Sequence, residues 1–500
     1  MNLSSRREFL KTTIAAAGAA LTTRGLRAAS ANRVAGANDA VRVAVIGLGD
    51  TKAIGGVGGR GHQLIASLLQ APNARIAALC DVDESFLARE AQPLKDKGHD
   101  VVTHRDLRRV FDDKSIDAVV VATPNHWHGL ATVWACQAGK DVYVEKPFSH
   151  NLWEGKQMVA AARKHGRIVQ TGTQNRASPL LREAFAELHG GSLGRIRFAH
   201  AIMYRARDGI GRVDAPPAVP ASIDYDLWCG PAPKAPLRRK QLHYEWHWFW
   251  DTGNGEIGNN GVHMIDLCRM ALRSTALPTR GMSIGGRFAV DDAAETANTQ
   301  VALLAFEPAP LICEIRNVRK AGPEAIGKVR NRNRGVIIDC ENGYFAGDAT
   351  GGAFYDRQDK QIKAVKPDGT GGRLEVAHLS NFLAAVRSRK SADLICEAWE
   401  GHCSAAAAHL ANISYRIGRT AAPDAIRERI RGERELTDAF ERCREHLRDN
   451  GVDLGKTPAV LGPWVTLDAK QTRFTGEFAE GANALLKRQY RAPFVVPEIA

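Results

Sequence analysis

The stretch Val41-Arg42-Val43-Ala44-Val45-Ile46-Gly47-Leu48-Gly49 decides the fold class. Its β-branched run predicts a buried strand, and the glycines behind it predict a tight turn into a helix at residues 62–69. Short apolar runs that predict further strands follow at residues 74–80, 118–122, 141–144 and 168–171. Helical stretches lie between most of them, and this alternation is typical of a doubly wound parallel sheet in an α/β protein.

The glycines after the first strand predict a dinucleotide site. Gly47 and Gly49 begin a turn in which backbone N–H groups approach a pyrophosphate at a helix N-terminus. The regular pattern places a third glycine at position 52, which is Lys52 here. The loop is therefore about nine residues longer than usual, and Gly59 and Gly61 stand at its far end. The segment Gly56-x-Gly58-x-x-Gly61 has the same regular spacing, so the sequence leaves open which glycines form the turn and whether the segment is only a flexible loop.

An acidic residue closes the next predicted strand. Asp81 follows Ile76-Ala77-Ala78-Leu79-Cys80, where a carboxylate accepts hydrogen bonds from the adenosine ribose. A carboxylate there repels a ribose 2′-phosphate, so the sequence favours NAD, with NADP as the alternative. A surface aspartate at a strand end is the structural interpretation of the same residue.

Polar residues follow two more strands at the same expected edge. Thr123-Pro124-Asn125-His126 comes after the strand at residues 118–122, and Glu145-Lys146-Pro147 comes after the strand at residues 141–144. Ligands of open α/β sheets bind beyond the carboxyl ends of strands. A lysine beside a cationic nicotinamide has its charged form disfavoured and exchanges protons near neutrality. The alternatives are turn and helix-cap roles for the first group and a surface ion pair for Glu145 and Lys146.

Jointly these motifs resemble the glucose-fructose oxidoreductase, inositol dehydrogenase and rhizopine-catabolism (Gfo/Idh/MocA) family over roughly residues 41–420. Glu145-Lys146-Pro147 is the best-known family signature. The other segments that carry the resemblance are Thr123-Pro124-Asn125-His126, Val169-Gln170-Thr171-Gly172, Trp246-His247-Trp248-Phe249-Trp250, Gly258-Asn259-Asn260-Gly261-Val262-His263, Asp266, His378 with Asn381-Phe382, and His409-Leu410 with Asn412-Ile413.

The resemblance implies an N-terminal Rossmann domain and a second α/β domain whose open sheet faces the cleft. It implies that Lys146 contacts the nicotinamide ribose and a substrate hydroxyl, and that His263 is the acid/base at the reacting carbon. Many members have an aspartate four residues before that histidine, but this chain has Asn259. An amide cannot hold the negative charge that supports an imidazolium. On a helix, Asp266 lies on the same face as His263 and is the expected substitute.

The substrate candidates are less specific. The aromatic cluster that includes Tyr244, Trp246 and Trp248 fits a platform for a sugar ring, with core or interface packing as the alternative. Of this cluster, Trp248 is the predicted substrate contact. Gln174, Tyr204 and Arg207 are further pocket candidates.

The sequence as a whole predicts four regions. Residues 1–31 are an export signal, 38–165 the Rossmann domain, 166–420 an α+β substrate and oligomerisation domain with an open, mostly antiparallel sheet, and 421–500 a C-terminal helical extension with an extended arm. Strand-like runs at residues 196–203, 297–306 and 311–318 and alanine-rich helical runs at 378–389 and 396–417 support the third region.

Composition and charge exclude several classes of protein. The chain has 500 residues, 44% of them hydrophobic, and a net charge of +13. Four of these charges lie in the first 31 residues, and no nucleic-acid motif accompanies the rest, so we expect no nucleic-acid partner. No run reaches the roughly 18 apolar residues of a membrane span. The nine cysteines are odd in number and form no Cys-x-x-Cys pair, so neither a disulfide framework nor a metal site is indicated.

The N-terminus has the parts of an export signal in order. Arg6-Arg7 precedes the apolar run Ile14–Leu21, and Ala29-Ser30-Ala31 follows. The segment resembles a twin-arginine signal, which implies the twin-arginine export machinery as a partner and a periplasmic or other extracytoplasmic location. That route exports folded proteins, often with cofactor bound. A frayed basic helix is the alternative.

The sequence therefore predicts an exported NAD(P)-dependent oxidoreductase acting on a hydroxyl or carbonyl of a sugar, cyclitol or related polyol. NAD-dependent glycoside cleavage through transient sugar oxidation, with the cofactor recycled, is the alternative from another class. A non-catalytic sugar-binding relative is the third possibility, suggested only by Asn259. By analogy with the family, we expect a homo-oligomer.

Overall fold

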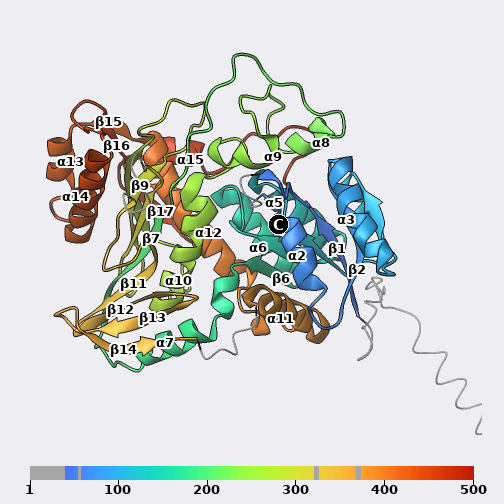
Figure 1. The fold of residues 1–500 in the computed structure, drawn as a ribbon, viewed down its shortest axis with the longest axis horizontal. Coiled ribbons are helices and arrows are strands. Elements are labelled where there is room, and N and C mark those ends of the chain that lie inside the picture. Colours follow the sequence, from blue (N-terminus) through green and yellow to red (C-terminus); the bar gives the residue numbers. More distant parts are fainter. Residues whose placement is uncertain (1–39, 54–57, 320–325, 368–372, 500) are drawn as a thin grey trace, which may run out of the picture. The chain divides into compact units, whose positions relative to one another are not determined.

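The structure is a computed structural model that describes residues 40–53, 58–319, 326–367 and 373–499. The predicted export signal lies outside the described residues. Residues 40–500 group into one compact unit, and a parallel sheet and a larger mixed sheet are its two frameworks (Figure 1).

The first framework confirms the predicted Rossmann sheet. Six parallel strands lie in the order β3-β2-β1-β4-β5-β6. The elements are β1 (Val41–Ile46), α2 (Arg60–Leu68), β2 (Ala74–Cys80), α3 (Glu84–Asp96), β3 (Val102–His104), α4 (Leu107–Asp112), β4 (Ala118–Val121), α5 (Asn125–Gln137), β5 (Asp141–Glu145), α6 (Leu152–Lys164) and β6 (Val169–Gly172).

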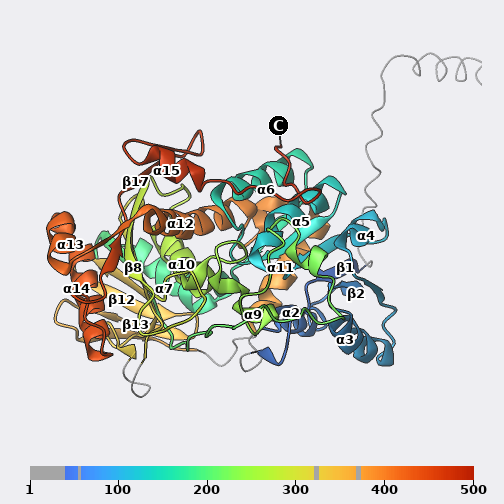
Figure 2. The ribbon, with the colours of Figure 1, turned by 90° about the horizontal axis from the view of Figure 1, so that it is seen from above.

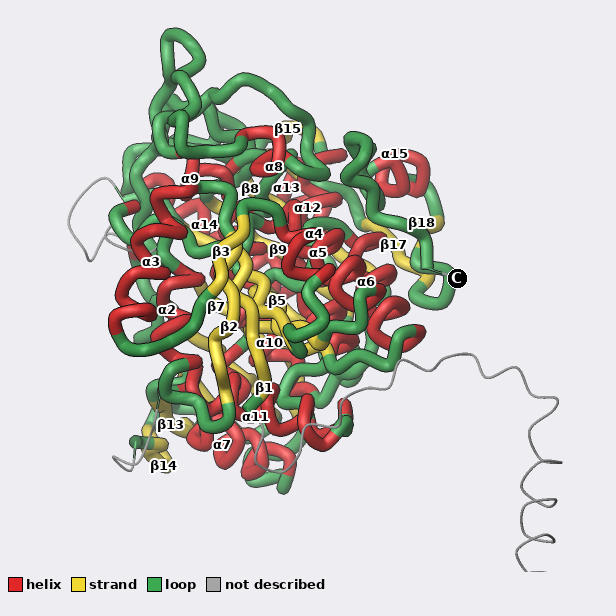
Figure 3. The backbone as a smooth tube through the Cα atoms, turned by 90° about the vertical axis from the view of Figure 1, so that its right-hand side faces the viewer, coloured by secondary structure: helices red, strands yellow, loops and turns green. Residues whose placement is uncertain are grey.

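The central strands β1 and β4 are mostly apolar because helices cover both faces of the sheet (Figure 3). On β1, Val43 and Val45 belong to a hydrophobic cluster with α2, whereas Ala44 and Ile46 belong to a cluster with α5. Successive side chains of a strand point to opposite faces. The run Val41–Ile46 therefore contributes side chains to two cores.

The second framework is a twelve-stranded sheet with ten strands in the order β14-β13-β12-β11-β7-β10-β9-β8-β16-β15; β17 pairs with β8, and β18 pairs with β17. Only β10 and β7 pair in parallel, so the predicted mostly antiparallel sheet is confirmed. The strands are β7 (Ile196–Tyr204), β8 (Arg280–Gly286), β9 (Thr299–Ala305), β10 (Leu311–Arg316), β11 (Arg334–Cys340), β12 (Gly343–Asp348), β13 (Gly351–Tyr355), β14 (Gln361–Val365), β15 (Arg419–Ala421), β16 (Ala459–Leu461), β17 (Val465–Asp468) and β18 (Arg473–Thr475).

Helices accompany this sheet on both faces, as β9 illustrates. Ala302 and Leu304 pack in the cluster that contains residues of α10 and α12, whereas Val301 and Leu303 pack in the cluster with α13 and α14. Figures 1 and 2 show α13 and α14 on the side of the sheet away from α10. The helical elements are η2 (Gln174–Ala177), α7 (Pro179–His189), α8 (Tyr225–Cys229), α9 (Leu242–Glu245), η3 (Trp246–Trp248), the π-helical turn η4 (Ile257–Gly261), α10 (Val262–Leu272), α11 (Leu374–Ser388), η6 (Ser391–Asp393), α12 (Ala398–Ile417), α13 (Pro423–Ile430), α14 (Arg434–Asp449) and α15 (Ala479–Ala484).

Several elements pair or pack across the predicted domain boundaries. Strand β6 extends the parallel sheet beyond residue 165, and α11 packs back onto it through Leu379 and Phe382. The segment 421–500 is not only a helical extension and arm, because β16 and β17 pair with β8. Its last residues return to the Rossmann sheet, where Phe494 packs edge-on against Trp127 of α5. Short strands with polar residues, and segments that pack on distant parts of the chain, show little of the periodicity from which strands and helices are predicted.

No helix in the described ranges has the length and hydrophobicity of a membrane span.

Candidate active site

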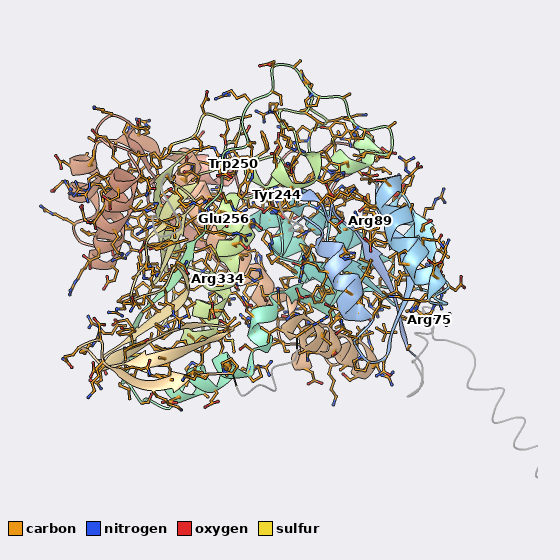
Figure 4. All side chains as sticks on the ribbon, in the orientation of Figure 1. Arg75, Arg89, Tyr244, Trp250, Glu256 and Arg334 are labelled. Carbon is orange, nitrogen blue, oxygen red and sulfur yellow. The ribbon has the colours of Figure 1, made fainter. Side chains whose placement is uncertain are left out.

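One cavity of about 420 Å³ opens at the carboxyl ends of the parallel strands. Its Rossmann side includes Gly47, Gly49, Gly58, Arg60, Asp81, Thr123, Asn125, Glu145 and Lys146, and its other side includes Gln174, Arg205, Tyr244, Trp246, His247, Asn259, Asn260 and His263. The glycine turn, the acid after β2 and the lysine after β5 therefore surround the same space. Figure 4 shows Tyr244 and Glu256 between the Rossmann helices and the larger sheet.

The glycine loop shows which of the two glycine spacings applies. Gly47 and Gly49 have φ of +86° and +76°, and both line the cavity. A Cβ on Gly61 would lie 1.9 Å from the carbonyl oxygen of Gly47, so Gly61 lets α2 approach β1 as closely as the third glycine of a Rossmann turn does. Gly59 is the N-cap residue of α2. Neither Gly59 nor Gly61 lines the cavity, so their contribution is to the shape of the loop.

Helix α2 begins at the cavity with Arg60, whose guanidinium is paired with the Glu145 and Glu375 carboxylates. It has no side-chain cap and no acidic residue in its first turn, and the first residue of the helix, Arg60, lines the cavity. A helix N-terminus and a guanidinium both favour negative charge. This end of the cavity therefore fits a pyrophosphate.

Asp81 both shapes the loop and faces the cavity. Its Oδ2 accepts a hydrogen bond from the Leu48 amide at 2.6 Å, and its Oδ1 accepts one from the Asp83 amide at 2.9 Å. Burial raises the pKa of this carboxyl group, although the two backbone donors oppose the shift. Each oxygen keeps a lone pair for a further donor, as the hydroxyls of an adenosine ribose require.

The two histidines after β4 contact backbone carbonyl oxygens around the site and do not line the cavity. His126 does not line the cavity, contrary to the sequence prediction, because its Nε2 lies 2.9 Å from the carbonyl oxygen of Trp228. Burial lowers its pKa to about 3. His128 lies between the carbonyl oxygens of Pro147, at 2.7 Å, and Thr123, at 2.9 Å. These contacts support the helix-cap interpretation and connect the loops after β4 and β5.

Lys146 lies at the centre of the polar contacts. Its Nζ donates to the backbone carbonyl of Asn259 at 2.8 Å and to the side-chain Oδ1 of Asn259 at 3.1 Å. Burial lowers the pKa of Lys146 to about 8. The preceding Glu145 is held by the Arg60 guanidinium at 2.8 Å. The structure therefore does not favour the alternative of a surface ion pair between Glu145 and Lys146, and Lys146 is poised to exchange a proton near neutral pH.

His263 lines the cavity beside this lysine, as predicted. Burial and the neighbouring Lys146 keep its pKa well below the ordinary value of imidazole. Its buried Nδ1 has no hydrogen-bond partner among the described residues. A neutral imidazole with a free ring nitrogen is able to accept or relay a proton at this position.

Asp266 does not support His263, and that prediction is wrong. The Asp266 carboxylate is fully buried, and its Oδ2 accepts from Arg176 Nε at 2.7 Å. Its other oxygen accepts from the Ser404 hydroxyl at 2.7 Å. The carboxylate therefore joins α10 to η2 and α12 and lies outside the cavity lining.

Among the substrate candidates, only Gln174 lines the cavity. The Tyr204 hydroxyl donates to Glu314 on the other side of the larger sheet. Trp248 packs against Tyr244, and the Arg207 guanidinium lies 5.0 Å from the centre of the Trp248 ring. The core-packing interpretation therefore holds for Trp248.

Several cavity residues were not among the predicted site residues. Tyr244, Trp246 and His247 belong to the recognised aromatic segment, but the sequence does not show which of its rings face the ligand. Arg205 follows Tyr204 directly, so alternation along β7 would have placed it on the cavity side once the side of Tyr204 was known.

Comparisons with known proteins agree with this architecture. Residues 41–173 match the model of an oxidoreductase family with an NAD-binding Rossmann fold, and residues 208–295 match the model of that family's C-terminal alpha/beta domain. In a solved structure, an oxidoreductase from Agrobacterium radiobacter in complex with NAD+, L-tartaric acid and magnesium, the same fold recurs with a TM-score of 0.55 and 16% identity, over 76% of this chain and 97% of that one.

Two curated relatives match parts of the chain. Inositol 2-dehydrogenase 1 of Saccharopolyspora erythraea is 33% identical over 135 residues, which are 27% of this chain and 39% of the relative. Glycosyl hydrolase family 109 protein 2 of Shewanella sp. is 32% identical over 164 residues, which are 30% of this chain and 35% of the relative. The chain thus spans well under half the length of each. Both halves of the cavity lie in segments that match the two models of the Gfo/Idh/MocA oxidoreductase family or border them, so the chain is similar to that family over these segments.

Proposed function

We propose that this protein is an NAD-dependent dehydrogenase that acts on a hydroxyl or carbonyl carbon of a sugar, cyclitol or related polyol. The observation that carries the proposal is the single cavity that brings Asp81, the Gly47 turn, Lys146 and His263 together. Similarity to inositol 2-dehydrogenase 1 supports the polyol class.

The residues present fit the dinucleotide. The Gly47–Gly49 turn and the α2 N-terminus would hold the pyrophosphate, and Asp81 would accept from the adenosine ribose. The buried Asp81 carboxylate disfavours a 2′-phosphate, so NAD is the proposed cofactor over NADP. When bound, NAD supplies the acceptor or donor of a hydride.

The chain's own residues handle the proton. With a pKa of about 8, Lys146 is partly neutral at neutral pH, and its Nζ takes the proton of a substrate hydroxyl. Asn259 holds that nitrogen through two acceptors. The free Nδ1 of His263 provides a second acceptor beside it.

The direct test combines cofactor identification with a substrate panel. Protein purified after folding in the cytoplasm should carry about one nicotinamide dinucleotide per chain, identified by mass, and should reduce it with one or more polyols or aldoses. Protein without cofactor that also ignores added NAD and NADP would refute the proposal.

A second candidate function is glycoside cleavage through transient oxidation of a sugar carbon. Similarity to the Shewanella glycosyl hydrolase favours it, and NAD-dependent glycosidases are a known exception to the two-carboxylate scheme. Chromogenic glycosides distinguish the two candidates. Release of the chromophore without net NADH would favour the glycosidase, and NADH formation without release would favour the dehydrogenase.

We also propose that the protein is exported through the twin-arginine route as a folded holoprotein. The paired Arg6-Arg7, the apolar run Ile14–Leu21 and the Ala29-Ser30-Ala31 segment support this. A double R6K/R7K variant should stay in the cytoplasm while the parent chain is recovered outside it. Equal distribution of the two would contradict the proposal.

A homo-oligomer is the proposed assembly. On one face of the larger sheet, α13 and α14 pack against β8, β9 and β10, whereas residues of β7, β11 and β12 form a separate cluster without these helices; a second copy would cover the sheet beyond α13 and α14. Light scattering on the purified protein should give a multiple of the chain mass, and a monomer mass at micromolar concentration would contradict it.

A further inference from the structure

A buried carboxylate lies directly behind the Lys146–Asn259 contact. Glu256 is 1% exposed and precedes the π-helical turn η4 that carries Asn259. Its Oε1 accepts from Asn260 Nδ2 at 2.7 Å, and its Oε2 lies 3.5 Å from Asn259 Nδ2. π-helical turns are frequent at functional sites. Glu256 is not part of the cavity lining, so it acts on the site only through its neighbours.

The chemistry of a carboxylate determines how Asn259 is oriented. An ionised carboxylate only accepts hydrogen bonds, so the amide group that faces it must present its nitrogen. The carbonyl oxygen of the same amide then points to the other side, where it accepts from Lys146 Nζ at 3.1 Å. With the opposite orientation, two oxygens would face each other at Glu256 and two nitrogens at Lys146.

We propose that Glu256 is the positioning residue of the reaction: it selects the amide orientation of Asn259 and thereby holds Lys146 Nζ where the substrate hydroxyl loses its proton. This inference rests on the proposed dehydrogenase function. It also places a buried negative charge one turn before Asn259, at which many family members have an aspartate.

Arg207 keeps Glu256 in place. Its Nε donates to Glu256 Oε2 at 2.7 Å, and its Nη1 donates to the Tyr244 hydroxyl at 2.9 Å. The guanidinium also packs over the Trp248 ring. Arg207, which the sequence suggested as a substrate contact, thus binds the Glu256 carboxylate. Trp248, another of those candidates, packs against the Arg207 guanidinium.

Removing the charge of Glu256 and removing the charge of Arg207 should shift the pKa of Lys146 in opposite directions. The negative charge of Glu256 favours the ammonium form of Lys146, and the positive charge of Arg207 disfavours it. The other charged or titratable groups that act on the Lys146 side chain or respond to its charge are Glu145 on β5, Arg60 on α2, His128 on α5, His247 on η3 and His263 on α10. None of these is altered in the two variants below.

The experiment measures the ionisation of Lys146 directly in the purified full-length protein. An amine-reactive acylating reagent is applied over a range of pH, and modification of the Lys146 peptide is quantified by mass spectrometry. The midpoint of this pH profile should fall by about one pH unit in E256Q and rise by a similar amount in R207Q. The matched control E245Q, which removes another buried carboxylate of the same segment, should leave the midpoint unchanged.

Kinetics supply the second measurement. E256Q should lower kcat by about 10²-fold with little change in cofactor content, and E256D, which keeps the charge, should recover part of the loss. Unchanged midpoints in folded E256Q and R207Q, or shifts in the same direction, would overturn the inference. If E256Q does not fold, the direction of the R207Q shift decides. The modification profile needs no substrate, so it gives this result even if the protein turns over no polyol.

Discussion

Substituting Gly61 by alanine tests the packing on which the nucleotide end of the cavity depends. The new Cβ would lie 1.9 Å from the Gly47 carbonyl oxygen and 2.7 Å from the Leu48 Cα. Carbon atoms in contact are normally about 3.5 Å apart, so α2 must move away from β1 by roughly 1 to 1.5 Å. Both obstructing atoms are backbone atoms, and rotation of a side chain cannot relieve the clash.

Overpacking of this kind costs about 3 kcal/mol, and the displaced helix carries its N-terminus away from the pyrophosphate position. We expect G61A to melt at a lower temperature than the parent and to bind NAD at least about tenfold more weakly, a difference of about 1.4 kcal/mol. The control is G432A, because a Cβ on Gly432 meets nothing within 4 Å.

Thermal melts and titration of NAD into cofactor-free protein measure the two effects. If G61A and G432A share one melting temperature and one NAD affinity, the close approach of α2 to β1 does not shape this site, and the assignment of Gly61 as the third glycine fails.

Three further predictions concern titration and burial. The rate of polyol oxidation should rise with pH and level off above a midpoint of about 8, because the neutral form of Lys146 accepts the proton. K146A should abolish turnover while keeping its cofactor, and a turnover like the parent's would contradict this role. D266A leaves the buried Arg176 without its 2.7 Å partner and should lower the free energy of unfolding by about 3 kcal/mol or more. Its residual activity should keep the parent's pH midpoint, and a shifted midpoint would restore Asp266 to the catalytic group. Burial lowers the pKa of His126, His378 and His402 from 6.5 to about 3 each, so their contribution to stability is complete above pH 6.5 and lost as pH falls toward 3. Within that window the free energy of unfolding should fall by about 4 kcal/mol per pH unit, and a flat denaturant midpoint between pH 6.5 and 4.5 would count against it.

The cofactor end of the site could be predicted from the sequence because it depends on topology. Parallel strands end at one edge, so the residues that follow β1, β2 and β5 must converge there. Asp81 and Lys146 line the cavity for this reason.

The substrate end depends on tertiary contacts that carry no periodic signal. Asp266 and His263 share a helix, yet Arg176, from a segment about 90 residues away in the chain, binds the aspartate. Tyr204 lies next to Arg205, and only the sheet decides which of the two faces the cavity. The sequence did not single out Glu256, because Glu256 acts through its contact with Asn259. The departure of Asn259 from the family pattern was visible in the sequence.

The contact of Phe494 and Val496 with the Rossmann core has a consequence for biosynthesis. The Rossmann domain lacks part of its hydrophobic interior until residues 494–496 have been translated. A nascent chain therefore completes this nucleotide-binding domain only after the larger sheet has been synthesised, and dinucleotide capture follows that step. Removal of residues 494–496 would expose Trp127 of α5.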